Sequence, residues 1–136
     1  MLKSLCLFLY FFCFSAWGQD YAVICNQRLQ DLTPLQIKAA YLKKLTRHKG
    51  LHLVPLNLSL NDPLRKKFEK ELLKINFQSL KSYWTKQHYL GKRPPISMKS
   101  QKSAQAFVYK IQGAIAYVEL ENVQDNVKIL YQWKDD

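Results

Sequence analysis

Twice in this chain a short apolar run leads to a capping residue followed by proline. Residues 21–25 precede Thr33 and Pro34, and residues 51–56 precede Asp62 and Pro63. A short apolar run is typical of a buried strand, and a capping residue before proline is typical of a helix start. Alternation of this kind predicts an α/β fold, in which helices cover a small sheet.

The same signals predict the remaining elements. Asn76 and Ser100 are capping residues in front of two further amphipathic segments, and Gly113 suits the position just after the last helix. We therefore expect about four helices, which begin at residues 34, 63, 77 and 101. The first continues through Leu45 and is closed by residues 48–50. Further strands are predicted over residues 114–118 and 127–133.

The first residues have the pattern of an export signal. Lys3 precedes an apolar run over residues 5–14, which is too short to span a bilayer because a spanning helix needs about 20 apolar residues. Ala16 and Gly18 fit the small positions of a signal-peptidase site. We expect residues 1–18 to be a cleavable signal peptide and residues 19–136 to be one exported, periplasmic domain. The alternative is an uncleaved N-terminal anchor.

The chain is strongly basic. Its formal net charge is +11, and loss of Lys3 with the signal peptide leaves +10. Such a charge attracts nucleic acid, anionic lipid, anionic polymer or an acidic protein. Export argues against nucleic acid, and acidic residues such as Glu69 and Glu71 stand among the lysines. We expect a solvated basic surface and no nucleic-acid role.

Motifs for catalysis and for metal binding are missing. Once residues 1–18 are removed, Cys25 is the remaining cysteine, and it lies in an apolar run where a thiol acts as a small hydrophobe. His48, His52 and His88 lack metal-ligand spacing, and neither a P-loop nor a GxGxxG run occurs. We predict no catalytic residues, no metal and no cofactor. An enzyme stays as the third alternative.

An aromatic stripe follows the cap at Asn76. Phe77, Leu80 and Trp84 recur at helical spacing, which places them on one face of the helix. We interpret this face as part of the core. The alternative is a platform for a ligand.

Several stretches carry the pattern of a known family. They are LTPLQIKAAYL, LHLVPLN, NDPLRKKFEKELL, LKSYWTKQHYLGKRPP and SAQAFVYKIQGAIAYVE. The chain resembles the phosphate-type periplasmic substrate-binding proteins of ABC transporters, in particular their short single-lobe relatives, over about residues 20–119. The resemblance implies that residues 19–136 form a single lobe of a type 2 periplasmic-binding-protein-like fold. A second glycine is common in the family where Ala116 stands here.

The resemblance also implies where a ligand would bind. In the family this lobe contributes an arginine and a Ser-Gly-Thr run where a strand turns into its helix. Here these positions fall near Leu58 and at residues 62–64. Leucine offers no bidentate donor, the Asp62 carboxylate repels an anion, and Pro63 lacks a backbone N–H. We therefore expect the family's phosphate site to be degenerate.

Four polar residues are the candidate ligand contacts. Asn57, Ser59 and Asn61 surround the predicted turn, and Ser100 stands at another helix start. The competing interpretation is that all four are caps and turn formers.

Two functions follow from the sequence. The first is an exported, non-catalytic solute-binding-protein-like module that recognises a small anion or an envelope protein partner. In that case a homodimer would restore the second side of the cleft, and no transmembrane helix remains after signal cleavage. The second is a basic accessory protein of the envelope that binds anionic lipid, polymer or an acidic protein.

Overall fold

The structure is a computed structural model that describes residues 19–135. The predicted signal peptide, residues 1–18, lies outside the described residues, as does residue 136. A five-stranded sheet with strand order β5-β4-β6-β1-β7 forms the centre of the molecule. Its strands are β1 (Asp20–Cys25), β4 (Val54–Leu58), β5 (Ile96–Met98), β6 (Ala114–Glu119) and β7 (Lys128–Lys134). The helices are α1 (Pro34–Tyr41), α2 (Pro63–Phe68), α3 (Phe77–Tyr89) and α4 (Gln101–Lys110).

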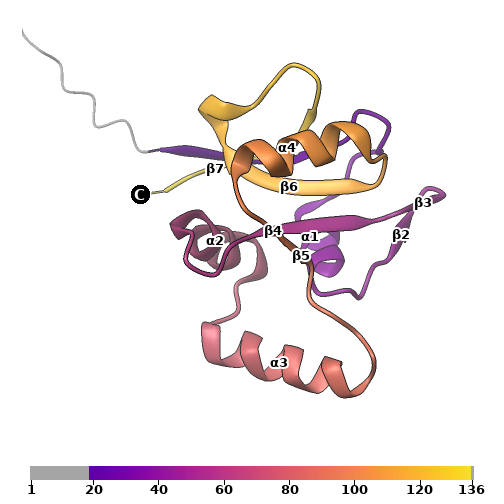
Figure 1. Cartoon of the computed structure of the whole chain (residues 1–136), viewed down its shortest axis with the longest axis vertical. Helices are drawn as coiled ribbons and strands as arrows, with labels where there is room; N and C mark the ends of the chain where they lie inside the picture. Colours follow the sequence, from indigo (N-terminus) through magenta and orange to yellow (C-terminus); the bar gives the residue numbers. More distant parts are fainter. Residues whose placement is uncertain (1–18, 136) are drawn as a thin grey trace, which may run out of the picture.

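The helices form layers on the two faces of the sheet (Figure 1). α1 and α2 lie on one face, and α4 covers the other. α3 lies beyond α1 and α2, at the bottom of Figure 1, and stands apart from the sheet. The fold class is therefore α/β, with a small central sheet flanked by four helices in the described part of the chain, as the sequence predicts.

The sheet is mixed. β4 runs parallel to both β5 and β6, whereas β1 runs antiparallel to β6 and β7. Parallel neighbours need a crossover. Here α2 and α3 connect β4 to β5, and α4 connects β5 to β6. The carboxyl ends of β4, β5 and β6 therefore meet at one edge.

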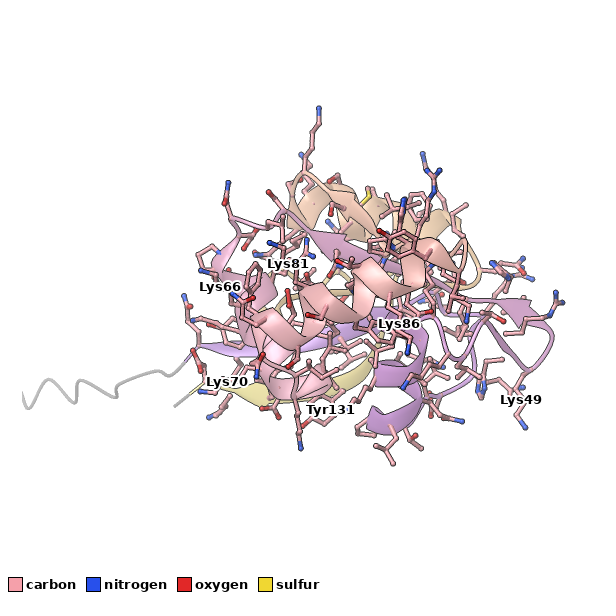
Figure 2. The ribbon with its side chains drawn as sticks, turned by 90° about the horizontal axis from the view of Figure 1, so that it is seen from below. Lys49, Lys66, Lys70, Lys81, Lys86 and Tyr131 are labelled. Carbon is pink, nitrogen blue, oxygen red and sulfur yellow. The ribbon has the colours of Figure 1, made fainter. Side chains whose placement is uncertain are left out.

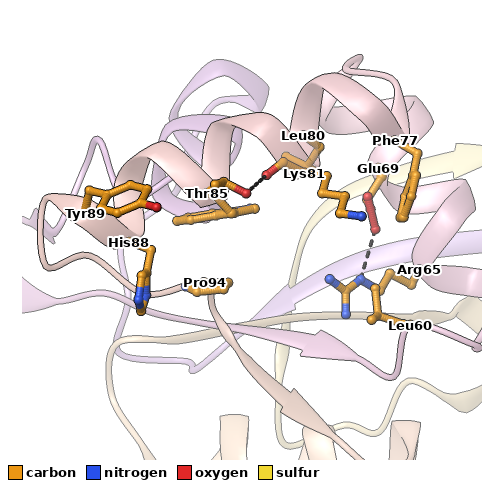
Figure 3. A pocket seen from close by; sticks show the side chains of 11 residues that line it. Leu60, Arg65, Glu69, Phe77, Leu80, Lys81, Thr85, His88, Tyr89 and Pro94 are labelled. Carbon is orange, nitrogen blue, oxygen red and sulfur yellow. Dashed lines mark hydrogen bonds and ion pairs between the residues drawn. The ribbon is translucent and has the colours of Figure 1, made fainter.

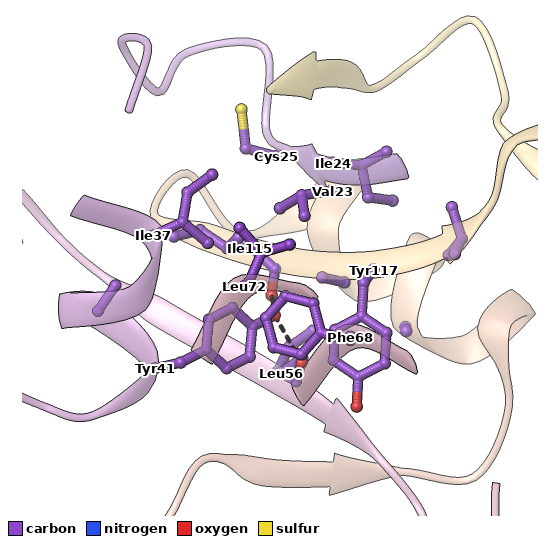
Figure 4. Packing of buried hydrophobic residues seen from close by; sticks show 14 of the residues in the cluster. Val23, Ile24, Cys25, Ile37, Tyr41, Leu56, Phe68, Leu72, Ile115 and Tyr117 are labelled. Atoms are coloured by element: carbon purple, nitrogen blue, oxygen red, sulfur yellow. Dashed lines mark hydrogen bonds between the residues drawn. The ribbon is translucent and has the colours of Figure 1, made fainter. Parts of the chain in front are cut away.

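Aromatic rings fill the core between the sheet and the α1–α2 layer (Figure 4). The centroids of the Tyr41 and Phe68 rings lie 4.6 Å apart, and Tyr117 packs beside both. The Tyr41 hydroxyl donates a hydrogen bond to the carbonyl of Leu56 at 2.8 Å. Burial of one large apolar side chain stabilises a fold by about 1.5–3 kcal/mol, so this cluster holds α1 and α2 on the sheet.

Each predicted helix start is confirmed. Thr33, Asp62, Asn76 and Ser100 all take extended backbone angles, and each side-chain oxygen accepts a hydrogen bond from a backbone N–H in the first turn. Such bonds satisfy donors that a helix leaves free at its start. These local contacts set the positions of all four helices along the chain.

The first helix is shorter than predicted. It ends at Tyr41, and Lys43 takes a left-handed conformation with φ 60°. A small hairpin follows, in which β2 (Arg47–His48) pairs with β3 (Leu51–His52). The prediction that Leu45 belongs to the helix was therefore wrong. Lys49 and Gly50 both have positive φ, as a tight two-residue hairpin turn requires.

Pro55 lies inside β4, whereas its lack of a backbone N–H predicts an edge position or the exit of a strand. Its position is tolerated because β4 pairs with β5 only from Leu56 onward, whereas Val54 and Pro55 face β6. Pro55 therefore lies ahead of the β5 ladder, where its missing N–H breaks no bond to β5.

The second helix changes its winding. α2 ends at Phe68, and a π-helical turn, η1 (Glu69–Leu73), continues it to Lys74, which has φ 53°. A final 3₁₀ turn, η2 (Leu120–Asn122), follows β6. The helix predicted to begin at residue 63 is therefore divided into an α-helical and a π-helical part.

Candidate functional site

The candidate ligand contacts lie at the carboxyl edge of the parallel strands. Leu58, the last residue of β4, pairs with Met98, the last residue of β5. The turn with Ser59 and Asn61 and the helix start at Ser100 therefore meet at this edge, although about 40 residues separate them in the chain. In open α/β sheets, ligands bind at the carboxyl ends of the strands.

The turn after β4 is closed by its own backbone. The N–H of Asp62 donates to the carbonyl of Ser59 at 2.9 Å, and an Asp62 carboxylate oxygen accepts from the N–H of Leu64 at 3.0 Å. Ser59 and Asn61 are exposed. Of the predicted contacts, these two are the ones turned to solvent in the turn.

Asn57 is placed differently. It is only 7% exposed, and its Oδ1 accepts a hydrogen bond from the Tyr117 hydroxyl at 2.9 Å. That hydroxyl accepts in turn from the N–H of Leu58 at 3.0 Å. Burial raises the pKa of Tyr117 well above its usual range, so the phenol stays protonated and the network fixes the end of β4.

Ser100 forms the cap of α4. Its Oγ accepts from the N–H of Ser103 at 3.1 Å, while its own N–H donates to the Ser103 Oγ at 3.1 Å. This reciprocal pair is a capping box. Ser100 remains exposed, so its hydroxyl lies at the surface of the carboxyl edge.

An arginine that is not among the predicted ligand contacts lies beside this edge. Nη1 of Arg65 donates to the carbonyl of Leu58 at 3.0 Å, and its Nε donates to Glu69 at 3.0 Å. The resemblance places the family's arginine near Leu58, and here a guanidinium reaches that point from α2. The spacing of four between Arg65 and Glu69 was the available signal.

A groove lies between α3 and the β4–α2 turn (Figure 3). Its volume is about 600 Å³, within the range of about 300–1,000 Å³ that is usual for small-molecule sites. Aromatic and aliphatic side chains form most of its wall. The lining residues are Leu60, Arg65, Glu69, Phe77, Leu80, Lys81, Trp84, Thr85, His88, Tyr89 and Pro94.

A second hollow of about 630 Å³ adjoins the first. The two share Leu60, Glu69 and Phe77. Its other lining residues are Lys66, Lys70, Lys74, Ile75 and Asn76. We call the two hollows together the α3 groove.

The aromatic stripe divides between core and groove. Leu80 is buried, but Phe77 is 62% exposed and Trp84 is half-buried. The interpretation of the stripe as core is correct for Leu80 and wrong for Phe77. Tyr83, next to Trp84, donates from its hydroxyl to the carbonyl of Leu42 at 2.6 Å and so attaches α3 to the α1 end.

The remaining reactive groups lie outside this region. Cys25 is fully buried, and that burial raises its pKa to about 11, which disfavours the nucleophilic thiolate. Within residues 19–135 no cluster of three or more His, Cys, Asp or Glu side chains could hold a metal ion. Over the same residues no helix is both long and apolar enough to cross a membrane.

Solved structures of known proteins share this architecture. An ABC-type phosphate transport receptor from Vibrio cholerae superposes with a TM-score of 0.66 at 17% identity, over 82% of this chain and 45% of that chain. The fold is that of one lobe of a phosphate-type substrate-binding protein. A putative phosphate ABC transporter substrate-binding protein from Clostridium perfringens, with bound phosphate, gives 0.63 at 19% identity, over 82% and 44% of the two chains.

The likeness concerns the fold, and it covers part of the larger proteins. The substrate-binding-protein-like lobe matches less than half the length of each of these two neighbours. No family model matches the sequence, and no curated protein matches it. The resemblance stated from the sequence is therefore confirmed at the level of the fold.

Proposed function

We propose that this lobe is an exported, non-catalytic binding module that recognises a small ligand or an envelope partner. The observation that carries the proposal is the meeting of two polar turns at the carboxyl edge of β4 and β5, set by the pairing of Leu58 with Met98. Ser59, Asn61 and Ser100 are the proposed contacts, and buried Asn57 positions their turn. The two solved neighbours are, by their descriptions, phosphate transport proteins, which supports a binding role.

In our proposal, the ligand that binds at this edge is not the family's phosphate. Asp62 keeps a carboxylate at the start of α2, and Pro63 supplies no N–H there. The Leu58 side chain is buried, so it offers no contact. Arg65 is the nearby cation, but Glu69 and a carbonyl already hold it. A neutral or weakly charged polar ligand fits this edge better than phosphate does.

A thermal unfolding series tests the proposal. The purified protein is melted with about 10 mM phosphate, sulfate, chloride or neutral polyols at matched ionic strength, because a ligand at 100 times its Kd adds about 2.7 kcal/mol. A selective rise in Tm that disappears in the double variant Ser59→Ala, Asn61→Ala supports binding at this edge. The matched control is Ser79→Ala with Ser82→Ala, on the exposed start of α3. A rise in Tm that persists in the Ser59/Asn61 variant would show that these two side chains do not contact the ligand.

The second candidate function is a basic accessory protein of the envelope. One observation favours it: residues 72–118, which include α3, β5 and α4, contain eight Lys or Arg and no Asp or Glu. Binding to anionic vesicles or polymer should then fall steeply with added salt, since the Debye length shrinks from about 10 Å at 0.1 M to about 3 Å at 1 M. Association that does not respond to salt would exclude this function.

Export and assembly are separate parts of the proposal. Mass spectrometry of the protein recovered outside the cytoplasm should show a chain that begins at Gln19. Light scattering of that protein measures its molar mass in solution. The mass of a dimer would support a homodimer in which the second copy provides the other wall of the polar edge. A mass that includes residues 1–18 would favour the uncleaved anchor.

A further inference from the structure

The α3 groove is elongated. Its first hollow is lined by α3 residues from Phe77 to Tyr89, and the 13 residues of this helix span about 20 Å at 1.5 Å per residue. The two hollows share Leu60, Glu69 and Phe77 in their walls, so they lie directly next to each other. An extended molecule would fit such a shape better than a compact ion.

One end of the groove is aromatic. Trp84, Tyr89 and Pro94 line this first hollow together with Phe77, and Figure 3 shows Phe77 and Tyr89 at its opposite ends. Leu60 and Phe77 are each 62% exposed, and Tyr89 is 84% exposed. Large apolar side chains gathered in one exposed hollow are typical of a binding surface.

The other end is cationic. Lys66, Lys70 and Lys74 line it, and Figure 2 shows Lys66 and Lys70 beside the start of α3 with Lys81 next to them. Among the described residues, Glu69 is the one acidic residue that lines the two hollows. Because Arg65 pairs with Glu69 at 3.0 Å, the lysines keep their charge available for a ligand.

We propose that the α3 groove binds an amphiphilic anion, meaning an alkyl or aryl tail that ends in a carboxylate or a phosphate. The tail lies against Phe77 and Trp84, where burial of apolar surface favours binding. The anionic head lies among Lys66, Lys70 and Lys74. Charge complementarity at one end and apolar contact at the other fix the direction of the ligand. This inference rests on the proposed small-ligand function but assigns it the α3 groove, which adjoins the polar edge at Leu60.

Calorimetric titration of the purified protein tests the inference. Dodecanoate below its micelle concentration is the probe, dodecyltrimethylammonium carries the same tail with the opposite charge, and acetate carries the head without a tail. We expect saturable binding of dodecanoate about tenfold tighter than that of the cation, and no binding of acetate. Equal affinity for the two dodecyl compounds would overturn the assignment of the head.

Two charge-matched variants locate the site. The triple variant Lys66→Gln, Lys70→Gln, Lys74→Gln should weaken dodecanoate binding at least about fivefold. The control variant Lys99→Gln, Lys102→Gln, Lys110→Gln removes the same charge from residues that line neither hollow, and it should leave the affinity unchanged. Both triples change exposed side chains, so folding is checked by circular dichroism. An equal loss of dodecanoate affinity in both triple variants would contradict the assignment of the α3 groove as the binding site.

Other outcomes separate this inference from the proposed function. If a polar solute raises Tm while dodecanoate does not bind, the proposed function stands and the groove assignment fails. If dodecanoate binds while no polar solute does, the groove is the ligand site and the polar edge is not. Binding only to anionic vesicles or only to an acidic peptide would replace the single amphiphile with a membrane or a protein. If neither a polar solute nor dodecanoate binds, both the proposed function and the groove assignment fail.

Discussion

The rings of Phe68 and Tyr117 stack with their centroids 4.1 Å apart and their planes inclined by 8°. Phe68 is the last residue of α2 and Tyr117 lies on β6, so this stack fixes α2 against the sheet. The hydroxyl of the same tyrosine holds Leu58 and Asn57. The turn with the proposed contacts is therefore anchored to the core through one side chain.

Substitution Tyr117→Phe should keep the stack and remove the hydroxyl. The Leu58 N–H and the Asn57 Oδ1 then lose a buried partner, which costs about 1–3 kcal/mol. Urea unfolding measures this loss. Tyr131→Phe is the control, since its hydroxyl bonds Glu71 at a half-buried site, and it should cost less. Equal costs would contradict the role assigned to Tyr117.

Gly113→Ala should be strongly destabilising. A Cβ at this position would lie 1.8 Å from the carbonyl oxygen of His52, so backbone has to move, at a cost of about 2–3 kcal/mol. Gly91→Ala meets no atom within 4 Å but has φ +79°, and it should cost only about 1 kcal/mol. Thermal unfolding compares the two, and a smaller effect for Gly113 would refute the close approach.

Glu69→Gln should increase the affinity for dodecanoate. The change removes a negative charge from the α3 groove and releases Arg65 from its ion pair, while the amide oxygen still accepts a hydrogen bond. We expect affinity to rise about two- to fivefold in calorimetric titration. Glu71→Gln, which lies outside both hollows, is the control. A rise in both variants would indicate a general charge effect.

Cys25 should be inert in the folded protein. Its pKa is raised to about 11 from 9.0 by burial, so the neutral thiol is favoured in the folded state. The associated stability is present below pH 9 and is lost as the pH rises from about 9 through 11, because the unfolded chain ionises first. A thiol reagent at pH 8 should count the same number of thiols in the protein and in Cys25→Ala. In denaturant the variant should show one fewer.

The helix starts and the fold class could be predicted because they depend on neighbours in the sequence. Thr33 and Asn76 cap helices through contacts within three residues, and a linear pattern records such contacts. The end of α1 depends instead on a hairpin. β5 was not predicted because its three residues are exposed or half-buried and form a strand only by pairing with β4.

The candidate site was predicted only in part for the same reason. Ser59 and Asn61 were found because they stand in a recognisable turn, but the burial of Asn57 requires Tyr117, 60 residues away. The α3 groove was not predicted because residues of both α2, such as Arg65, and α3 line it. No periodicity in the sequence reports how far apart two helices pack.

α3 is attached to the rest of the lobe through few buried contacts. Leu80 is its buried residue, and the Tyr83 hydroxyl bonds Leu42 in the next layer. Elements with few buried contacts open locally at a lower free energy than the global one. Amide hydrogens of α3 should therefore exchange with solvent earlier than those of β1, whose residues from Tyr21 to Cys25 are all buried. The part of this lobe that opens and closes over a bound molecule would then be a single helix, and the rate of its opening would set how fast a ligand escapes.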